Sequence, residues 1–298
     1  MSQSKEQIVI AVVGDVHNQW NRADEEALKH LGVDLVLFVG DFGNEAVEVV
    51  GQIARVDLPK AVIMGNHDAW YSASSWGRNK APYDQSQEDR VQQQLDALGN
   101  THVGFSKLDF PQCDLSVVGS RPFSWGGSTW RNARFYSDRY NIKNFEESTR
   151  RIVNSAQETA HNAIILIGHN GPSGLGDKPE SICGRDWKPE GGDYGDPDLQ
   201  SAIEEIKKSG KSIPLVTFGH MHHELKYPRG ERRKIIDVRE DTIYLNAACV
   251  PRIIKSDRGE QRSFSLVTLE QQKVVEISLV WLDTDFAIAS NEIIYSKQ

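Results

Sequence analysis

The sequence predicts an α/β fold with largely parallel strands, and two observations lead to that expectation: short apolar runs, and helical patterns between them. The runs are rich in Val, Ile and Leu with little polar alternation, which is typical of strands buried on both faces. Strands are expected at 8–13, 35–39, 61–64, 115–118, 164–167 and 213–218. Because strand and helix alternate, the pattern favours βαβ units with parallel strands.

Helices are expected where apolar residues recur along one stripe of a 3.6-residue period. In 21–31 this stripe contains Ala27, Leu28 and Leu31. Asp196 followed by Pro197 is typical of an N-cap and first helical position, and Gly210 is typical of a helix end. The predicted helices are 21–31, 45–56, 85–98, 145–160 and 197–208.

The C-terminal third changes to a pattern of antiparallel strands joined by turns. The expected strands are 234–238, 242–245, 263–269 and 274–281, with a turn at Asp257, Arg258 and Gly259. We expect these strands to form a second sheet packed on the first. Because no linker or repeat separates them from the rest, residues 1–298 are expected to form a single domain.

Three segments fit neither pattern and are expected to be cap-like loops or insertions, near 70–89, 121–140 and 171–197. The first is polar and aromatic, and the third is rich in Gly, Pro and Asp. Loops of this length inside a compact domain are usually functional or disordered. Since the first and third directly follow candidate site residues, we expect them to form walls of the site.

Composition restricts the class of protein. The chain has 42 Asp and Glu against 34 Lys and Arg, a formal net charge of −8, which argues against general nucleic-acid binding. Three scattered cysteines without a CxxC pair favour a reducing compartment. No signal-peptide pattern or apolar run of membrane-spanning length occurs, so we expect a soluble, intracellular, cytoplasmic protein without membrane contact. No partner protein can be inferred.

Polar side chains follow the predicted strands at the points where each apolar run ends. In an open α/β sheet such positions meet beyond the carboxyl ends of the strands, where ligands bind. A glycine precedes each group and allows the chain to turn sharply. The candidates are Asp15 and His17, Asp41, Asn66 with His67 and Asp68, His169, and His220 with His222.

These residue types predict a metal site. Imidazole, carboxylate and one amide oxygen, without thiolate, suit Mn, Fe or Zn, and Mg is also compatible; we expect two divalent ions, with Mn the first choice. Two metals roughly 3.5–4 Å apart can clamp a phosphoryl group during in-line attack. Asp41, with two carboxylate oxygens, is the natural bridge between them.

The order DxH, GD, GNHD, H and GHxH across 15–222 resembles the calcineurin-like metallophosphoesterase superfamily. The resemblance implies a four-layer αββα sandwich of two mixed β-sheets flanked by helices. It also implies that His67 protonates the leaving alkoxide and that Asp68 orients the His67 ring. One metal would be held by Asp15, His17, Asp41 and His222, and the other by Asp41, Asn66, His169 and His220. The stretch 168–180 resembles an uncharacterised branch found in cyanobacteria and plastids.

The chain departs from the family pattern after the second motif. Many members carry an acidic residue at the position of Asn44, and here Glu45 comes one residue later. Phosphoprotein phosphatases of the family also carry an arginine just beyond, which this chain lacks. The departure argues against a protein phosphatase and leaves the candidate ligands intact.

The segment 121–140 combines arginines with aromatic residues. As a cap over the site it would supply guanidinium groups to phosphate and an aromatic face to a ring. The alternative is a surface element anchored by its aromatic residues, with its arginines in solvent. The candidate substrate contacts are Arg121, Arg131, Arg134, Trp125 and Tyr136.

The sequence therefore predicts a metal-dependent enzyme that hydrolyses a small phosphate ester. A monoester such as a nucleotide or sugar phosphate is favoured, because the polar loops could enclose a small substrate. A phosphodiesterase acting on a cyclic nucleotide or another small diester is the close alternative. A nuclease, a protein phosphatase and a non-catalytic scaffold rank lower.

Overall fold

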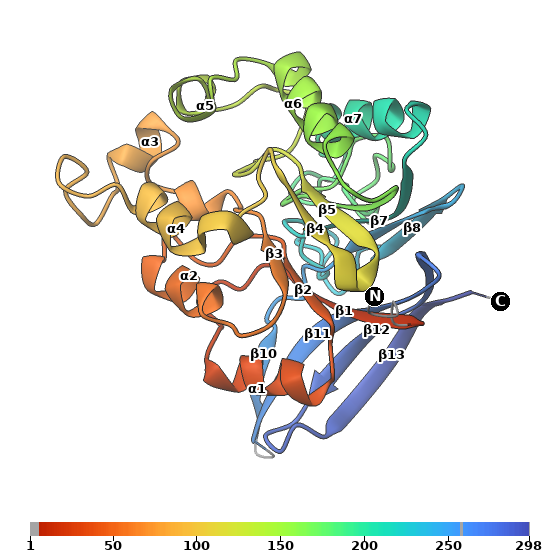
Figure 1. Ribbon diagram of the computed structural model, residues 1–298. Helices are drawn as coiled ribbons and strands as arrows, with labels where there is room; N and C mark the ends of the chain where they lie inside the picture. The colour runs from red at the N-terminus through yellow and green to blue at the C-terminus, as the bar shows by residue number, and fades with distance from the viewer. Residues whose placement is uncertain (1–5, 257–258, 298) are drawn as a thin grey trace.

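The computed structural model describes residues 6–256 and 259–297, which form two mixed β-sheets flanked by helices (Figure 1). One sheet has the strand order β13-β12-β11-β1-β2-β3, with β10 paired to β11. Its strands are β1 (Gln7–Val13), β2 (Leu35–Phe38), β3 (Lys60–Val62), β10 (Ile253–Ser256), β11 (Gly259–Glu270), β12 (Lys273–Leu282) and β13 (Ile288–Ser296). Parallel pairing joins β1, β2 and β3, and antiparallel pairing joins the rest.

The other sheet has the strand order β4-β5-β6-β7-β9-β8. Its strands are β4 (Lys107–Phe110), β5 (Leu115–Gly119), β6 (Ala163–Ile167), β7 (Ser212–Phe218), β8 (Ile236–Arg239) and β9 (Thr242–Asn246). The pairs β5–β6, β6–β7 and β7–β9 are parallel, and the outer pairs are antiparallel.

Helices lie on the outer face of each sheet. In Figure 1, α1 and α2 lie beside β1, β2 and β3, whereas α6 and α7 lie beside β5 and β7. The helices are α1 (Arg22–His30), α2 (Val47–Ala54), α3 (Ser75–Arg78), α4 (Arg90–Leu98), α5 (Ala133–Tyr140), α6 (Phe145–Gln157) and α7 (Pro197–Lys208), with 3-10 turns η1 (His67–Ala69), η2 (Gly99–Thr101) and η3 (Pro111–Cys113). The four-layer arrangement expected from the resemblance is confirmed.

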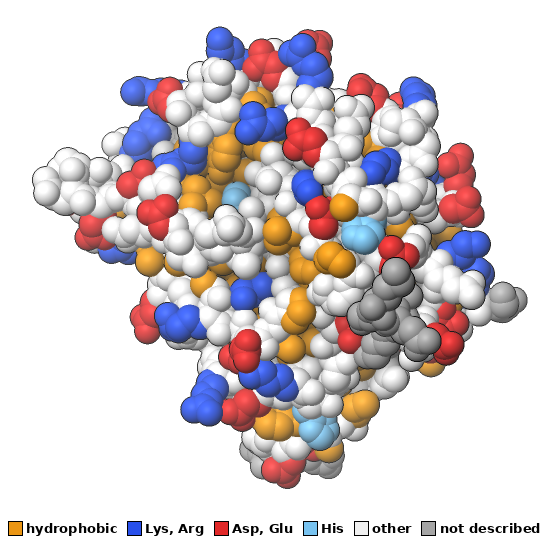
Figure 2. Space-filling view, viewed as in Figure 1, with side chains coloured by type: hydrophobic (Ala, Val, Ile, Leu, Met, Phe, Trp, Pro, Cys, Tyr) orange, Lys and Arg blue, Asp and Glu red, His pale blue; other side chains and the backbone are white. Residues whose placement is uncertain are grey.

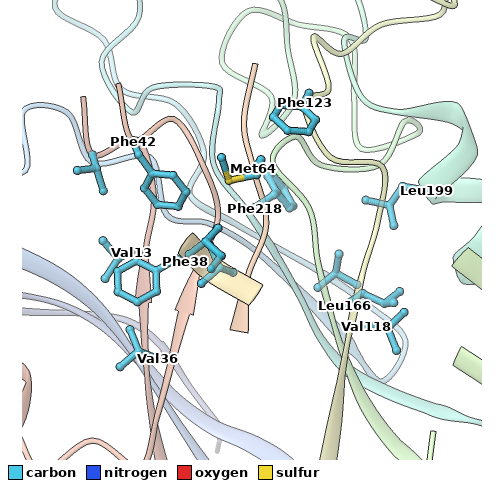
Figure 3. Packing of buried hydrophobic residues seen from close by; sticks show 14 of the residues in the cluster. Val13, Val36, Phe38, Phe42, Met64, Val118, Phe123, Leu166, Leu199 and Phe218 are labelled. Carbon is cyan, nitrogen blue, oxygen red and sulfur yellow. The ribbon is translucent and has the colours of Figure 1, made fainter. Parts of the chain in front are cut away.

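Side-chain alternation along the strands explains the layers. In β1, Ile10 and Val12 join a core between the two sheets that also receives Ile165 from β6. Ala11 and Val13 point to the opposite face and pack with the helices. Figure 3 shows this second cluster, in which Phe38 and Phe42 lie on one side, and Val118, Leu166 and Leu199 on the other. From Ile8 to Val13 both faces of β1 are buried or half-buried, which is why this part of its sequence is entirely apolar.

The expected sheet composition was wrong in one respect. The C-terminal strands do not form a sheet of their own: β8 and β9 join β4–β7, whereas β10–β13 join β1–β3. Every residue of β9 is buried, and this strand pairs parallel with β7. Local patterns identify strands but not their partners, because pairing depends on packing between distant segments. Of the predicted turn, Asp257 and Arg258 lie outside the described residues.

The surface gives two further observations. No helix among the described residues is long and apolar enough to cross a membrane. On the face drawn in Figure 2, basic and acidic side chains are interspersed rather than gathered into one basic patch.

Candidate metal centre

All seven predicted metal ligands lie together at one place, beyond the carboxyl ends of strands from both sheets. Each follows a strand that the sequence identified, so the sheets set the positions of the side chains. Asp15 and His17 follow β1, Asp41 follows β2, Asn66 follows β3, His169 follows β6, and His220 and His222 follow β7. One sheet therefore supplies part of the site and the other sheet the rest.

One group of potential ligands consists of Asp15, His17 and His222. The Oδ1 atom of Asp15 lies 3.4 Å from Nε2 of His222 and 3.8 Å from Nε2 of His17. The two imidazole Nε2 atoms are 3.2 Å apart. Three donor atoms thus face a common point from two sheets.

A second group consists of Asp41, His169 and His220, with Asn66 beside it. The Nε2 atom of His169 lies 3.2 Å from Oδ1 of Asp41, 2.9 Å from Oδ1 of Asn66 and 3.2 Å from Nδ1 of His220. The Nδ1 atom of His169 is 2.9 Å from the carbonyl oxygen of Val39, to which it can donate. That contact fixes the ring and leaves Nε2 as the ligand atom.

The backbone of the ligand loops is strained. Asp15, His17, Asp41 and His220 have φ values of +48°, +43°, +56° and +68°, in the left-handed region that side-chain-bearing residues rarely adopt. Such conformations persist where the surrounding structure enforces them, and they cluster at functional sites. Close approach adds to this: a Cβ on Gly65 would lie 2.3 Å from Oδ1 of Asp41.

The donor set fits a metal centre in its charge as well as its geometry. The Oδ1 atom of Asp15 is fully buried and has no hydrogen-bond partner among the described residues. An unpartnered buried carboxylate oxygen is costly unless a cation or proton satisfies it. Burial lowers the pKa of His169, but Asp41 and Asp15 outweigh burial and raise it to about 9. The pocket therefore favours positive charge, which divalent ions would supply.

His67 lies beside these ligands on η1. Its Nε2 atom is 3.9 Å from Oδ2 of Asp41, so this nitrogen faces the candidate metal ligands. Its Nδ1 atom is 2.5 Å from Oδ1 of Asn44, which accepts a hydrogen bond from the Nδ1–H tautomer of the ring. Burial lowers the pKa of His67, and Asp41 opposes that shift.

The expected contact between Asp68 and the His67 ring is wrong. Asp68 is fully buried, and its carboxylate accepts hydrogen bonds from three backbone N–H groups, those of Asp41, Phe42 and Gly65, at 3.0, 2.8 and 2.6 Å. Asp68 thus ties the loops after β2 and β3 together, and Asn44 is the partner of the ring. In the sequence, Asn44 is notable only because many members of the family carry an acidic residue at its position. That difference was the one indication that Asn44 has a role in the site.

Glu45 is a second residue whose role the sequence left unassigned. It is 1% exposed, and its carboxylate accepts hydrogen bonds from the backbone N–H groups of Tyr71 and Ser72 at 2.8 and 2.6 Å. The hydroxyl of Tyr83 also donates to it. Its own N–H donates to the carbonyl of His67 at 3.0 Å. Glu45 therefore attaches the 70–89 segment to the loop that carries His67.

Two of the predicted substrate contacts line a cavity beside the ligands. Trp125 and Arg131 border a space of about 440 Å³, together with Asp41, His67 and His222. This volume is in the range of small-molecule sites. Residues from the 70–89 and 171–197 segments line it as well, namely Trp70, Asp186, Trp187 and Tyr194.

The other three predicted contacts lie elsewhere. Arg121 is 3% exposed and pairs with Asp196 and Asp198 at 2.8 Å each, so it is a structural cation. Tyr136 is buried, and its hydroxyl donates to the carbonyl of Pro122. Arg134 pairs with Asp138 on the exposed face of α5 and borders a separate groove. The rings of Trp130, Tyr136 and Phe145 pack around the Arg121 guanidinium, and local sequence does not show this packing.

The 171–197 segment is held against the site by a residue that sequence reasoning missed. Arg233 is 3% exposed and donates from Nη1 to the carbonyls of Pro179, Ser181 and Gly184. Its Nε donates to the carbonyl of His222 at 3.0 Å. Arg233 thus links this wall to a ligand loop. Nothing in the sequence distinguishes it from its neighbour Arg232.

Comparisons with known proteins bear on the family and the fold of the chain. The family model for calcineurin-like phosphoesterases matches residues 8–224. One solved structure superposes with a TM-score of 0.54 at 11% identity, covering 92% of this chain and 98% of the other. A Thermus thermophilus protein gives a TM-score of 0.49 at 11% identity, covering 97% and 99%. A dimetal phosphatase from Danio rerio gives 0.46 at 10% identity, also covering 97% and 99%. No curated protein matches the sequence.

Proposed function

The chain belongs to the calcineurin-like phosphoesterase family and is a metal-dependent phosphoester hydrolase, and on this premise we propose that its substrate is a small phosphomonoester. Members of the family use a dinuclear centre of divalent ions. The observation that carries the proposal is the cavity of about 440 Å³ that opens on the candidate ligands and is bordered by all three loop segments. Such a space suits a small molecule better than a protein surface.

We propose the ligand set implied by the resemblance. Asp15, His17 and His222 would hold one ion, Asn66, His169 and His220 would hold the other, and Asp41 would be a ligand of both. Bound ions would supply a hydroxide nucleophile and stabilise negative charge on the phosphoryl oxygens. The ions are proposed to be Mn, Fe, Zn or Mg, with Mn first, because imidazole and oxygen donors suit these metals.

His67 is proposed to donate the proton that the leaving alkoxide needs. Its Nε2 atom faces Asp41, and Asn44 accepts from Nδ1, so the ring is oriented with Nε2 toward the reacting group. Asp68 has no proposed contact with the reaction. Its three hydrogen bonds with backbone N–H groups hold the loop of Asp41 against the loop of Asn66.

A phosphodiesterase is the second candidate. A positioned acid helps most when the leaving group is poor, as in an alkyl diester, and His67 is placed for that role. Residues 1–298 are proposed to act as one domain, since both sheets contribute to a shared core. A cytoplasmic location is also proposed, supported by the three free cysteines.

A panel assay tests this function. The full chain is freed of metal by chelation, reloaded separately with Mn, Fe, Zn or Mg, and assayed against matched monoesters and diesters of the same alcohols. We expect turnover of monoesters to exceed that of diesters. Preferential diester turnover would favour the second candidate, and no turnover under any condition would contradict the proposed activity.

A further inference from the structure

We propose that an aromatic wall beside the candidate metal centre binds the base of a nucleotide substrate. The aromatic wall consists of Trp70, Trp125, Trp187 and Tyr194, all of which line the same cavity as His67. The inference rests on the proposed phosphoesterase function and names the class of ester. The phosphate would lie at the candidate ligands and the base against the indole rings.

The aromatic wall is not part of the hydrophobic core. None of its four side chains belongs to either core cluster of the described residues. Trp187 is 43% exposed, a large apolar surface for a side chain in a loop. Exposed apolar surface gathered in a cavity marks a binding site more often than a structural need.

Two rings of the aromatic wall form a stack with His67, the proposed acid, and the other two rings contact each other. Trp70 stacks on His67 with ring centroids 4.4 Å apart and planes inclined by 19°. Trp125 continues the stack at 5.3 Å and 23°. Tyr194 holds Trp187 edge-on at 4.7 Å and 87°. Flat aromatic faces of this kind bind nucleobases by stacking, with little dependence on sequence or substituents.

Two cations in the same cavity match the anionic part of a nucleotide. Arg131 and Lys226 line it, and neither makes an ion pair with a described residue. The other arginine of the cavity, Arg233, is neutralised by Asp186 at 3.3 Å. Unpaired guanidinium and ammonium groups beside a metal centre are suited to phosphate oxygens. The same cavity is thus lined by candidate ligands and cations that suit a phosphate and by rings that suit a base.

Trp187→Ala tests the base contact. The metal-loaded full chain is assayed with adenosine 5′-monophosphate and with glycerol 1-phosphate, which has the same ester type and no ring. Stacking of a base on an aromatic ring contributes about 1–3 kcal/mol, which corresponds to a factor of about 5 to 150. We therefore expect kcat/KM for the nucleotide to fall by that factor. For glycerol 1-phosphate the change should stay below about 2-fold.

The matched control is Trp76→Ala. Trp76 is 57% exposed and does not line the cavity, although its edge lies near Trp70 at 5.9 Å between ring centroids. It should leave kcat/KM for both esters within about 2-fold of the unmodified protein. Equal losses for nucleotide and glycerol ester in Trp187→Ala would overturn the proposal, as would a preference for glucose 6-phosphate that depends on Trp187.

A binding measurement separates this proposal from the proposed function. Calorimetric titration of metal-free protein with adenosine, which has no phosphate, should give binding that Trp187→Ala weakens by the same factor. If no ester is hydrolysed but adenosine binds through Trp187, the phosphoesterase function fails and the base site stands. If monoesters are hydrolysed but adenosine does not bind, the base site is overturned and the function stands.

Discussion

The sequence predicted metal ligands in the loops after the strands and substrate contacts in the segment 121–140. The predicted residues of the loops lie together at the candidate site, whereas only some of those in 121–140 do. Every candidate ligand in the strand-end loops reaches the same point. In 121–140, Trp125 and Arg131 line the cavity, whereas Arg121 and Tyr136 are buried in the fold. The comparison shows that sheet topology positions residues at strand ends, whereas residues within an insertion are positioned by packing that the sequence does not display.

The largest expected effect comes from removing one charge in the ligand loops. Asp41→Asn keeps the shape of the side chain but weakens the proposed bridge, and metal ions contribute several kcal/mol to phosphoryl transfer. We therefore expect kcat/KM to fall by at least about 10³-fold. Elemental analysis should show fewer metal ions bound per chain. Asp57→Asn, an exposed carboxylate, is the control, and an Asp41→Asn protein with full metal content and activity would exclude Asp41 as the bridge.

Arg121→Met tests the structural side of the comparison. It leaves Asp196 and Asp198 buried without their cation, which costs about 3–5 kcal/mol of unfolding free energy. Urea denaturation measures the loss. Arg134→Met removes an exposed pair and should change the free energy of unfolding by less than about 1 kcal/mol. Unchanged stability in Arg121→Met with a tenfold loss of kcat/KM would restore Arg121 as a substrate contact.

The ends of the buried strands, and the candidate ligands that follow them, could be predicted from the sequence for one physical reason. The part of a strand that is buried on both faces is apolar, so its end is visible as the first polar residue after a glycine, as at Asp15 and Asp41. Strand partners are not visible in the same way. The buried β9 looks like any short apolar run, and its parallel pairing with β7 depends on segments far along the chain.

Roles that depend on a hydrogen-bond partner were harder to predict. The family resemblance implied that Asp68, the residue after His67 in the GNHD motif, orients the His67 ring. In the 3-10 turn η1 the Asp68 carboxylate instead reaches three backbone N–H groups, and Asn44 from another loop reaches the ring. Neighbours in sequence on a tight turn point in different directions, so adjacency is weak evidence of contact.

Asn44→Ala tests whether Asn44 orients the ring of His67. Without the acceptor for Nδ1, the ring loses its orientation, and we expect kcat to fall by about 10- to 100-fold, part of what a positioned acid supplies, with KM unchanged. Steady-state kinetics with a p-nitrophenyl ester, whose leaving group needs no proton, should show a smaller loss. Asn44→Asp, which keeps an acceptor oxygen, should retain most activity. Equal losses for alkyl and p-nitrophenyl esters would indicate a structural role instead.

The smallest expected effect compares two arginines of the same segment. Arg131 lines the cavity and has no ion pair with a described residue, whereas Arg134 pairs with Asp138 and borders a separate groove. A charge-assisted hydrogen bond to phosphate contributes about 1.5 kcal/mol, so Arg131→Met should raise KM about 10-fold with kcat unchanged, and Arg134→Met should not. Because Arg131 is exposed, salt should screen its attraction, and the difference in KM between the two variants should shrink at high ionic strength. A KM that rises equally in both variants would mean that the segment acts through its packing and that Arg131 does not touch the anion.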